Sequence, residues 1–441
     1  MHVREHRSRA HWGSVSEPTE RATAIMTTHA SPPPPPLRCA GAPPPGEIRA
    51  VVVERPEDMD CHLPAWESLA EHAVEPNVFY EPWMLLPAVR HLGPFEGLRF
   101  VLFFAPSIED RRKEVLTGLF PLQRCATETA VSLPATGLFR HAFCYLRTPL
   151  LRARYARETV AAFLDFATSD RADAPLLELG EMVADGPFRK LVTDELYRRG
   201  TLSFPVNAYT RALFLPADGA DAYLEYALSS RHRRELGRKS RRLADAGPLA
   251  WETLSLSSDI EAFLDEFLAL EASGWKGRQG TALALAPARE AFFRETMRAA
   301  HARGRLLGLG LRAGETLAAQ RVSLLTGDGA MAFKVAFDER FAPSSPGVLL
   351  EAENIRRLHA PGAPAWMDCG AVPYSELFNR LWLHRRPIET LLLPTARPLG
   401  SVMVSLLPML RLANRLLASR GLGKRAAATT FSDGAETAER T

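Results

Sequence analysis

The stretch AMAFKVAFDERFAPSSPGVLLEAENIRRLHA, residues 330–360, decides the fold of the C-terminal half. Its first eight residues are β-like and follow two similar runs, 305–311 and 316–325, across short turns that contain glycine. Such turns predict an antiparallel meander of three strands. Next we expect a helix with Ser345 as N-cap and Pro346 at its first position, followed by another strand within 365–371.

A strand that leads into a helix brings unpaired backbone N–H groups and the positive end of the helix dipole to the edge of the sheet. Phosphate groups are frequent ligands of such a position. We therefore expect an anion near Ser344, Ser345 and Gly347. Ordinary capping by a Ser-Pro pair is the alternative, and the sequence alone leaves both open.

The remaining chain alternates β-like runs with helical patterns, for example the strand-like 98–104 and the helix-like 63–73. This alternation predicts the α/β (α+β) class, with mixed, mostly antiparallel sheets flanked by helices. At 441 residues, two domains of ordinary size are expected. The predicted divisions are a disordered Pro-rich segment at 1–47, domains at 48–216 and 217–395, an amphipathic helix at 396–423 and a disordered tail at 424–441.

Composition narrows the class of protein. The five cysteines form no CxxC, which is typical of a reducing compartment, and the twelve histidines form no zinc-binding motif, so we expect no metal. The first residues are too polar for a secretory signal, and no run of eighteen apolar residues occurs. We expect a cytoplasmic protein. Residues 398–420 either touch a membrane surface through Leu406, Leu410 and Leu417 or pack on the domain predicted at 217–395.

A basic run, Arg231–Arg242, holds seven Lys or Arg residues and one acid, Glu235. The net charge of the whole chain is only +3, so the run is a local feature. A solvated helix face is one interpretation, and attraction of an anionic acceptor or of cofactor phosphates by arginines such as Arg234 and Arg238 is the other. Because no DNA-binding motif accompanies the run, we expect no binding of duplex DNA.

Several segments resemble the CelD-type branch of the GNAT acyltransferase superfamily, a branch named from cellulose-biosynthesis gene clusters. The resemblance lies in LALEASGWKGRQGTALAL (268–285), VAFDERFAPSSPGVLLEAENI (335–355) and MDCGAVPYSELFNRLW (367–382), and in EPNVFYEPWMLLPAVRHLGP (75–94) and GLFPL (118–122) of the N-terminal half. It covers roughly residues 48–390. It implies two tandem GNAT-like domains, as in the Fem-type aminoacyl transferases, with the reaction in the C-terminal one.

The resemblance also implies acetyl-CoA or another acyl-CoA as donor, with pantetheine along 330–337 and pyrophosphate at the next helix start. Its candidate residues fall into three groups, each of which also has a structural alternative such as capping or packing. The catalytic candidates are Glu271, Lys334, Asp338, Asp368 and Tyr374; the cofactor-binding candidates are Phe333, Val335, Ser344, Ser345, Gly347 and Val348; the substrate-binding candidates are Arg234, Arg238, Trp275 and Lys276.

Two departures from the family pattern leave the function open. The segment RFAPSSPG has one glycine where a GNAT phosphate loop has more, and Asn379 follows Phe378 where relatives often have lysine. The favoured hypothesis is an N-acyltransferase that acts on an amine, on a sugar nucleotide or exopolysaccharide precursor. An aminoacyl-tRNA-dependent Fem-like transferase and a catalytically silent scaffold of a polysaccharide-synthesis complex are the alternatives. The oligomeric state is not predicted.

Overall fold

The structure is a computed structural model that describes residues 48–127, 129, 132–169, 173–396 and 398–419. For residues 410 and 413–419 it describes the backbone only. The segments predicted to be disordered, 1–47 and 424–441, therefore lie outside the described residues.

The described residues form strands and helices in an alternating order. The strands are β1 (Arg49–Val53), β2 (Arg99–Pro106), β3 (Glu114–Ala126), β4 (Pro134–Leu138), β5 (Leu150–Leu151), β6 (Leu176–Val183), β7 (Phe204–Phe214), β8 (Leu249–Thr253), β9 (Leu306–Ala313), β10 (Thr316–Thr326), β11 (Gly329–Phe337), β12 (Met367–Asp368) and β13 (His384–Pro394). The helices are α1 (Leu63–Glu71), α2 (Pro82–Leu92), α3 (Ala156–Ala167), α4 (Pro187–Arg199), α5 (Ala220–Ala227), α6 (Ser230–Ala244), α7 (Ile260–Ser273), α8 (Trp275–Arg278), α9 (Pro287–Ala302), α10 (Pro346–Arg357), α11 (Glu376–Leu381) and α12 (Leu399–Ser419). Short 3-10 turns are η2 (Pro56–His62), η3 (Val78–Tyr80), η4 (Ala153–Tyr155), η5 (Leu283–Leu285) and η6 (Glu339–Ser344).

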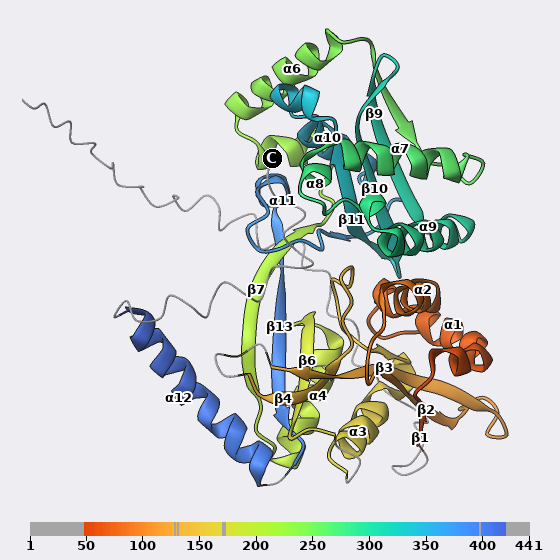
Figure 1. Ribbon diagram of the computed structural model, residues 1–441, viewed down its shortest axis with the longest axis vertical. Coiled ribbons are helices and arrows are strands. Elements are labelled where there is room, and N and C mark those ends of the chain that lie inside the picture. Colours follow the sequence, from red (N-terminus) through yellow and green to blue (C-terminus); the bar gives the residue numbers. More distant parts are fainter. Residues whose placement is uncertain (1–47, 128, 130–131, 170–172, 397, 420–441) are drawn as a thin grey trace, which may run out of the picture. The chain divides into compact units, whose positions relative to one another are not determined.

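The strands join in one mixed sheet in the order β1-β2-β3-β4-β6-β13-β7-β12-β11-β10-β9-β8, with β5 paired to β3 (Figure 1). The pairs β4/β6 and β11/β12 are parallel, and the other pairs in the described sheet are antiparallel. The predicted mixed, mostly antiparallel α/β architecture with flanking helices is confirmed.

Strand β13 joins the C-terminal part of the chain to the sheet of the N-terminal half. It is formed by residues after α11, yet it lies between β6 and β7 of the N-terminal half and pairs antiparallel with both (Figure 1). On its other edge, β7 pairs with β12 at Phe214 and Leu213. The sheet therefore runs without a break from one half to the other, and the domain boundary at residue 216 remains a prediction.

The meander β9–β11 carries helices on both faces. Alternation along β11 directs Met331 and Phe333 to the core that contains α7 and α9, and Ala330 and Ala332 to the core beneath α10. On α10, Leu350 and Ile355 are fully buried, and each such side chain contributes about 1.5–3 kcal/mol. The small side chains of Ala330 and Ala332 leave room for the helix above them.

One local prediction is wrong. The spacing of Leu224, Leu228, Leu236 and Leu243 predicts a single helix over 221–247. That helix is broken at Leu228, because the hydroxyl of Ser229 accepts a hydrogen bond from the His232 N–H and starts α6 as a separate helix. Ser345 does occupy the N-cap position of α10, but its side chain does not cap the helix. Its φ of 47° lies in the left-handed region.

Candidate active site

The sheet opens between β11 and β12. Strand β11 pairs with β10 along its length, but it pairs with β12 only at Ala330 and Met331. From Ala332 to Phe337, its β12 side faces a cavity of about 620 Å³. Backbone groups at such an unpaired edge can bind an extended chain that carries amide groups.

A bulge lies at the start of this open edge. Val322 of β10 is opposite Lys334 and Ser323 is opposite Ala332, so Phe333 is the extra residue on β11. A bulge interrupts the ladder and turns the local backbone, and bulges are common beside active sites. The Phe333 carbonyl accepts a hydrogen bond of 3.5 Å from the hydroxyl of Tyr145. This contact joins the bulge to the N-terminal half.

One end of the cavity carries a cation, Lys239, whose Nζ also lies 3.3 Å from Oε1 of Glu235. Lys239 of α6 donates from Nζ to the hydroxyl oxygen of Ser345 at 2.9 Å. At the start of α10, Pro346 has no N–H, and the Val348 N–H donates to the Ser345 carbonyl at 3.1 Å. Among the described residues, the Gly347 N–H has no acceptor. An ammonium group, a helix N-terminus and this amide together can bind an anion.

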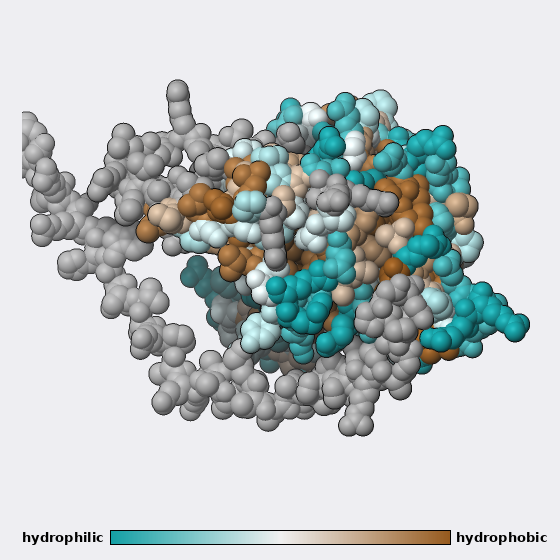
Figure 2. All heavy atoms as spheres, turned by 90° about the horizontal axis from the view of Figure 1, so that it is seen from below, coloured by the Kyte–Doolittle hydropathy of each residue, from teal (hydrophilic) through white to brown (hydrophobic). Residues whose placement is uncertain are grey.

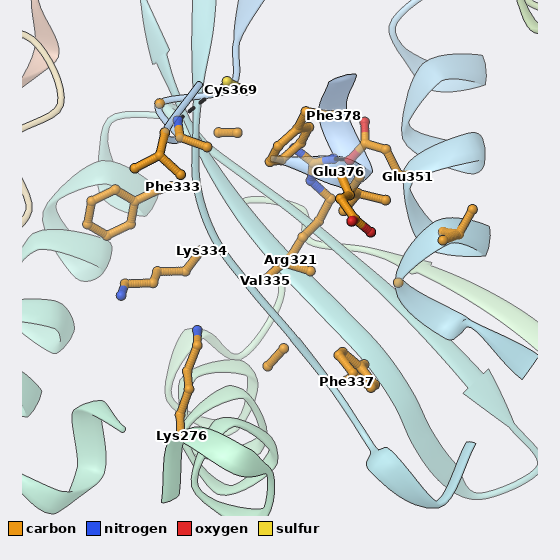
Figure 3. Close-up of a pocket in the computed structure, with 18 of the residues that line it drawn as sticks. Lys276, Arg321, Phe333, Lys334, Val335, Phe337, Glu351, Cys369, Glu376 and Phe378 are labelled. Atoms are coloured by element: carbon orange, nitrogen blue, oxygen red, sulfur yellow. Dashed lines mark hydrogen bonds and ion pairs between the residues drawn. The ribbon is translucent and has the colours of Figure 1, made fainter. Parts of the chain in front are cut away.

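Lys276 and Lys334 lie beside the bulge (Figure 3), and the carboxylate of Glu271 lines the same cavity. Nζ of Lys276 is 2.9 Å from Oε1 of Glu271, whose Oε2 accepts from the Leu283 N–H at 2.8 Å. Nζ of Lys334 lies 4.8 Å from the centre of the Phe143 ring. Burial, together with the positive charge of Lys276, lowers the pKa of Lys334 to about 8.

The carboxylate of this group remains ionised. Burial alone would raise the pKa of Glu271, but the charges of Lys276 and Lys334 and the hydrogen bond from Leu283 hold it below its usual value. Burial and the charge of Glu271 raise the pKa of Tyr145. The Tyr145 hydroxyl therefore stays protonated.

The cavity brings together nine of the sequence-predicted residues: Glu271, Trp275, Lys276, Phe333, Lys334, Val335, Ser345, Gly347 and Val348. The backbone N–H of Trp275 donates a hydrogen bond to Oε1 of Glu339 at 2.6 Å, which holds Trp275 in position. Their assigned roles remain predictions. Residues from both 268–285 and 330–348 thus line one cavity.

Six other predicted residues do not line the cavity: Arg234, Arg238, Asp338, Ser344, Asp368 and Tyr374. The Asp338 carboxylate accepts from the Arg340 N–H at 2.9 Å and so caps η6. Tyr374 is 62% exposed, whereas Ser344 is buried within η6. Arg234 and Arg238 are on the exposed side of α6.

Asp368 is a fully buried part of the sheet. Its carboxylate lies 2.7 Å from Nε of Arg211 and 3.0 Å from Nη1 of Arg386. Burial alone would raise its pKa, but the two guanidinium groups hold the pKa of Asp368 below its usual value. These contacts assign Asp368 a structural role between β7, β12 and β13.

Sequence reasoning missed the contributions of the N-terminal half, and on α6 it selected Arg234 and Arg238 rather than Lys239. Tyr145, Glu181 and Tyr209 line the cavity from the N-terminal half, and Lys239 lines it from α6. Their common location depends on long-range pairing that no local pattern shows. For Lys239 a signal was present, because it lies three residues after Leu236 and four before the buried Leu243, on the inward side of α6.

Residues 230–374 match a family model described as an acetyltransferase (GNAT) domain. The match contains α6, the open edge of β11 and the start of α10. No curated protein matches the chain by sequence.

Solved structures with similar folds include FemX, which is 10% identical over 80% of this chain and 99% of FemX, with a TM-score of 0.49. A conserved protein of unknown function from Bacteroides thetaiotaomicron VPI-5482 is 11% identical over 78% of this chain and 100% of that protein, with a TM-score of 0.48. A tandem GNAT protein from the clavulanic acid biosynthesis pathway is 14% identical over 79% and 99%, with a TM-score of 0.38.

Proposed function

We propose that this protein is a GNAT-type N-acyltransferase that transfers an acyl group, such as acetyl, from acyl-CoA to an amine. The observation that carries the proposal is the open edge of β11, which faces a cavity whose far end holds Lys239, Ser345 and the Gly347 N–H. An extended pantetheine arm suits the open edge, and a pyrophosphate suits the end with Lys239. The acetyltransferase (GNAT) family match over 230–374 supports the same assignment.

The residues beside the bulge suit the chemistry of acyl transfer. Lys334, with a pKa of about 8, takes a proton from the acceptor ammonium. The amine nitrogen then bonds to the thioester carbonyl carbon, and the cation of Lys276 stabilises the oxyanion that forms. When the carbon–sulfur bond breaks, Tyr145 protonates the departing thiolate. The second proton released by the nitrogen restores Tyr145.

The finer parts of the assignment are also proposals. The CelD-type branch and an acceptor among exopolysaccharide or cell-envelope precursors rest on the resemblance described for the sequence, and a cytoplasmic location rests on the cysteine pattern. A metal is not part of the proposed chemistry, and the described residues contain no group of three or more His, Cys, Asp or Glu side chains placed to bind one.

One observation favours a second candidate, a Fem-like transferase that uses aminoacyl-tRNA. The outer side of α6 exposes Arg231, Arg234, Arg238 and Arg241 away from the cavity. Such a row of cations suits contacts with a nucleic-acid backbone, and binding of this kind weakens steeply as salt rises.

Titration calorimetry of the purified protein with acetyl-CoA tests the proposal. We expect saturable binding that is competed by longer acyl-CoAs. Absence of heat together with RNA binding that is lost at high salt would support the Fem-like candidate. Absence of both would contradict both transferases and favour the scaffold hypothesis.

A further inference from the structure

A second bulge directs a carboxylate into the cavity from the N-terminal half. In the pairing of β6 with β13, Leu179 is opposite Leu391 and Met182 is opposite Glu389. Gly180 and Glu181 therefore lie opposite the single residue Thr390. Glu181 has a φ of 42°, which places a side chain other than glycine in the left-handed region. This conformation costs about 1–3 kcal/mol and persists only where its surroundings enforce it.

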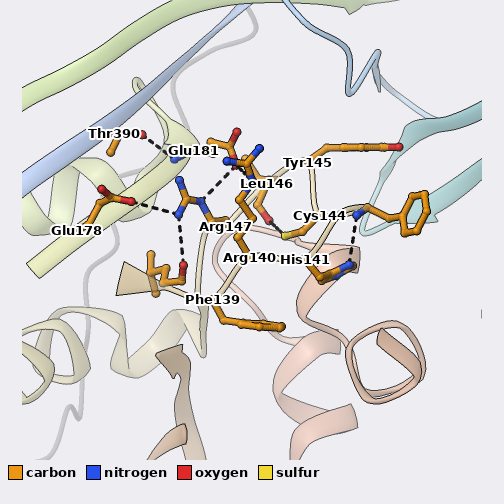
Figure 4. Close-up of polar contacts among 12 residues, drawn as sticks. Phe139, Arg140, His141, Cys144, Tyr145, Leu146, Arg147, Glu178, Glu181 and Thr390 are labelled. Atoms are coloured by element: carbon orange, nitrogen blue, oxygen red, sulfur yellow. Dashed lines mark hydrogen bonds and ion pairs between the residues drawn. The ribbon is translucent and has the colours of Figure 1, made fainter. Parts of the chain in front are cut away.

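The surroundings of Glu181 hold this strained backbone in place (Figure 4). Its N–H donates to the hydroxyl of Thr390 at 3.2 Å, and its carbonyl accepts from the Arg147 N–H at 3.1 Å. A Cβ at Gly180 would lie 2.0 Å from Cζ of Arg147, so a residue with a side chain would displace the guanidinium. The bulge, the glycine and the arginine therefore form one arrangement that fixes the direction of the Glu181 side chain.

Two arginines and one further carboxylate surround Glu181, and these groups differ in how deeply they are buried. Nε of Arg147 is 3.2 Å from Oε2 of Glu181, and the same guanidinium contacts Glu178 at 3.3 Å. Arg147 and Glu178 are almost completely buried. Nε of Arg140 lies 3.9 Å from the Glu181 carboxylate, and this arginine side chain is 36% exposed. A partly exposed contact of this length contributes little, so it is the one that a ligand cation can replace.

We propose that Glu181 binds the ammonium group of the acceptor, so that the acceptor is a protonated primary amine that enters from the N-terminal half. This inference rests on the proposed acyl transfer. The acyl donor occupies the end with Lys239 and Gly347, and the amine occupies the wall formed by Glu181 and Tyr209, which line the same cavity. The incoming ammonium takes the place of the Arg140 contact. Glu181 binds and orients the amine, and Lys334 removes its proton.

Transfer assays with three variants test this role. Thiol release from acetyl-CoA is followed with ethanolamine, glucosamine and spermidine, and with ethylene glycol and glucose as matched alcohols. E181Q keeps the shape of the side chain without its charge, E181G is compatible with the observed φ, and R140A removes the competing cation. Because a hydrogen bond to a charged group contributes about 1.5–3 kcal/mol, E181Q and E181G should raise KM for the amine roughly tenfold to a hundredfold. R140A should lower it.

The binding of acetyl-CoA separates this proposal from the proposed function. If acetyl-CoA does not bind the wild-type protein, acyl transfer itself is contradicted. If acetyl-CoA binds all variants equally, but E181Q has the wild-type KM for the amine, the role of Glu181 is overturned. Equal rates with glucosamine and glucose in the wild-type protein would also overturn it. A loss of acetyl-CoA binding in both Glu181 variants would indicate a structural role and likewise contradict the proposal.

An independent observation concerns the outer α12 face, formed by Leu399, Val402, Leu406, Met409 and Leu412. These side chains are 47–67% exposed and follow the three- and four-residue spacing of one helix side. The opposite side packs on the sheet, where Val404 is buried with Ala135 and Leu176. In Figure 2 the part of the surface where Figure 1 places α12 is largely hydrophobic. Of the predicted apolar side, Leu410 and Leu417 lie outside the described side chains.

The positive charge of the sequence around α12 indicates what kind of surface binds the outer α12 face. Between Glu389 and Asp433 the sequence has six Lys or Arg residues and no acid. None of the described helices is long and apolar enough to cross a membrane. An apolar helix face in a cationic segment suits the headgroup region of an anionic bilayer. We infer that the outer α12 face binds anionic membrane surfaces, with the helix axis in the plane of the interface.

Co-sedimentation with vesicles tests this inference. We expect the full chain to sediment with phosphatidylglycerol-containing vesicles at least fivefold more than with phosphatidylcholine vesicles, and L406E/M409E to lose this binding. Leu256, which is 70% exposed and outside α12, supplies the matched control L256E, which should bind as the wild type does. Equal binding of wild type and L406E/M409E would overturn the inference. Failure to bind vesicles, with dimerisation that L406E/M409E abolishes, would overturn it in favour of a second copy of this chain.

Discussion

Nζ of Lys239 donates to the hydroxyl of Ser345 at 2.9 Å, and this hydrogen bond ties the basic helix α6 to the start of α10. Lys239 is one of the seven Lys or Arg residues of the basic run Arg231–Arg242. The other basic residues of α6 do not line the cavity.

Removal of this cation should weaken donor binding. K239A deletes one charged partner of a phosphate, so Kd for acetyl-CoA should rise roughly tenfold to a hundredfold. R234A removes the same charge from the exposed side of the same helix and serves as the control. Calorimetry at moderate ionic strength measures both. Equal weakening by K239A and R234A would indicate a general effect of charge rather than a contact at Ser345.

The strained backbone at Ser345 supplies a test in which stability and binding change in opposite directions. Because φ is 47°, S345G should raise the free energy of unfolding by about 1 kcal/mol. The variant also loses the hydroxyl that positions Lys239, so acetyl-CoA affinity should fall. Urea unfolding and calorimetry on the same preparation measure the two effects. Lower stability in S345G would show that the hydroxyl contributes more than the strain costs.

The pH dependence of transfer should report Lys334. A base with a pKa of about 8 acts only when neutral, so kcat should rise with pH and level off above about 8. K334Q should have a much lower kcat without this rise. Acetyl-CoA affinity in K334Q is the control for an intact cavity. A pH profile in K334Q that matches the wild-type profile would exclude Lys334 as the base.

The same lysine should affect stability. The unfolded chain binds more protons at Lys334 than the folded chain between about pH 8 and the ordinary lysine pKa of 10.5, so wild-type stability should rise with pH across this window. K334M removes the cost of burying the charge and should be more stable than the wild type at pH 7. Its advantage should shrink as the pH approaches 10. Urea midpoints at several pH values measure this, and a constant difference would contradict it.

Asp368 should prove structural. D368N leaves Arg211 and Arg386 with reduced compensation in a buried site, so the free energy of unfolding should fall by about 3–5 kcal/mol. Thermal unfolding measures the loss. Any remaining folded protein should bind acetyl-CoA with wild-type affinity, because Asp368 does not line the cavity. Normal stability with abolished transfer would instead support the catalytic role expected from the sequence.

Local patterns predicted the elements that depend on near neighbours. The meander of β9–β11 and the helix that begins at Pro346 follow from glycine turns, alternation and proline placement. Lys334 and Phe333 could be named as site candidates because the family resemblance implies a donor bound along the third strand of that meander. The contact of Ser345 with Lys239 could not be predicted, since Lys239 lies more than a hundred residues earlier in the chain.

Residues of the N-terminal half could not be placed at the cavity from the sequence. Glu181 reaches it through a bulge against β13, and the register of that pairing depends on strands far apart in the chain. Tyr145 reaches Phe333 from a segment without regular secondary structure. Neither position carries a periodic pattern that distinguishes it from ordinary core residues.

The insertion of β13 between β6 and β7 has a consequence for biosynthesis. When β6 and β7 leave the ribosome, the strand that must lie between them has not yet been made, so each has an unpaired edge until the C-terminal residues emerge. The N-terminal half therefore cannot complete its sheet during translation ahead of the rest. A chain that ends before His384 should depend on chaperones or aggregate, even though it contains the whole segment that matches a GNAT domain.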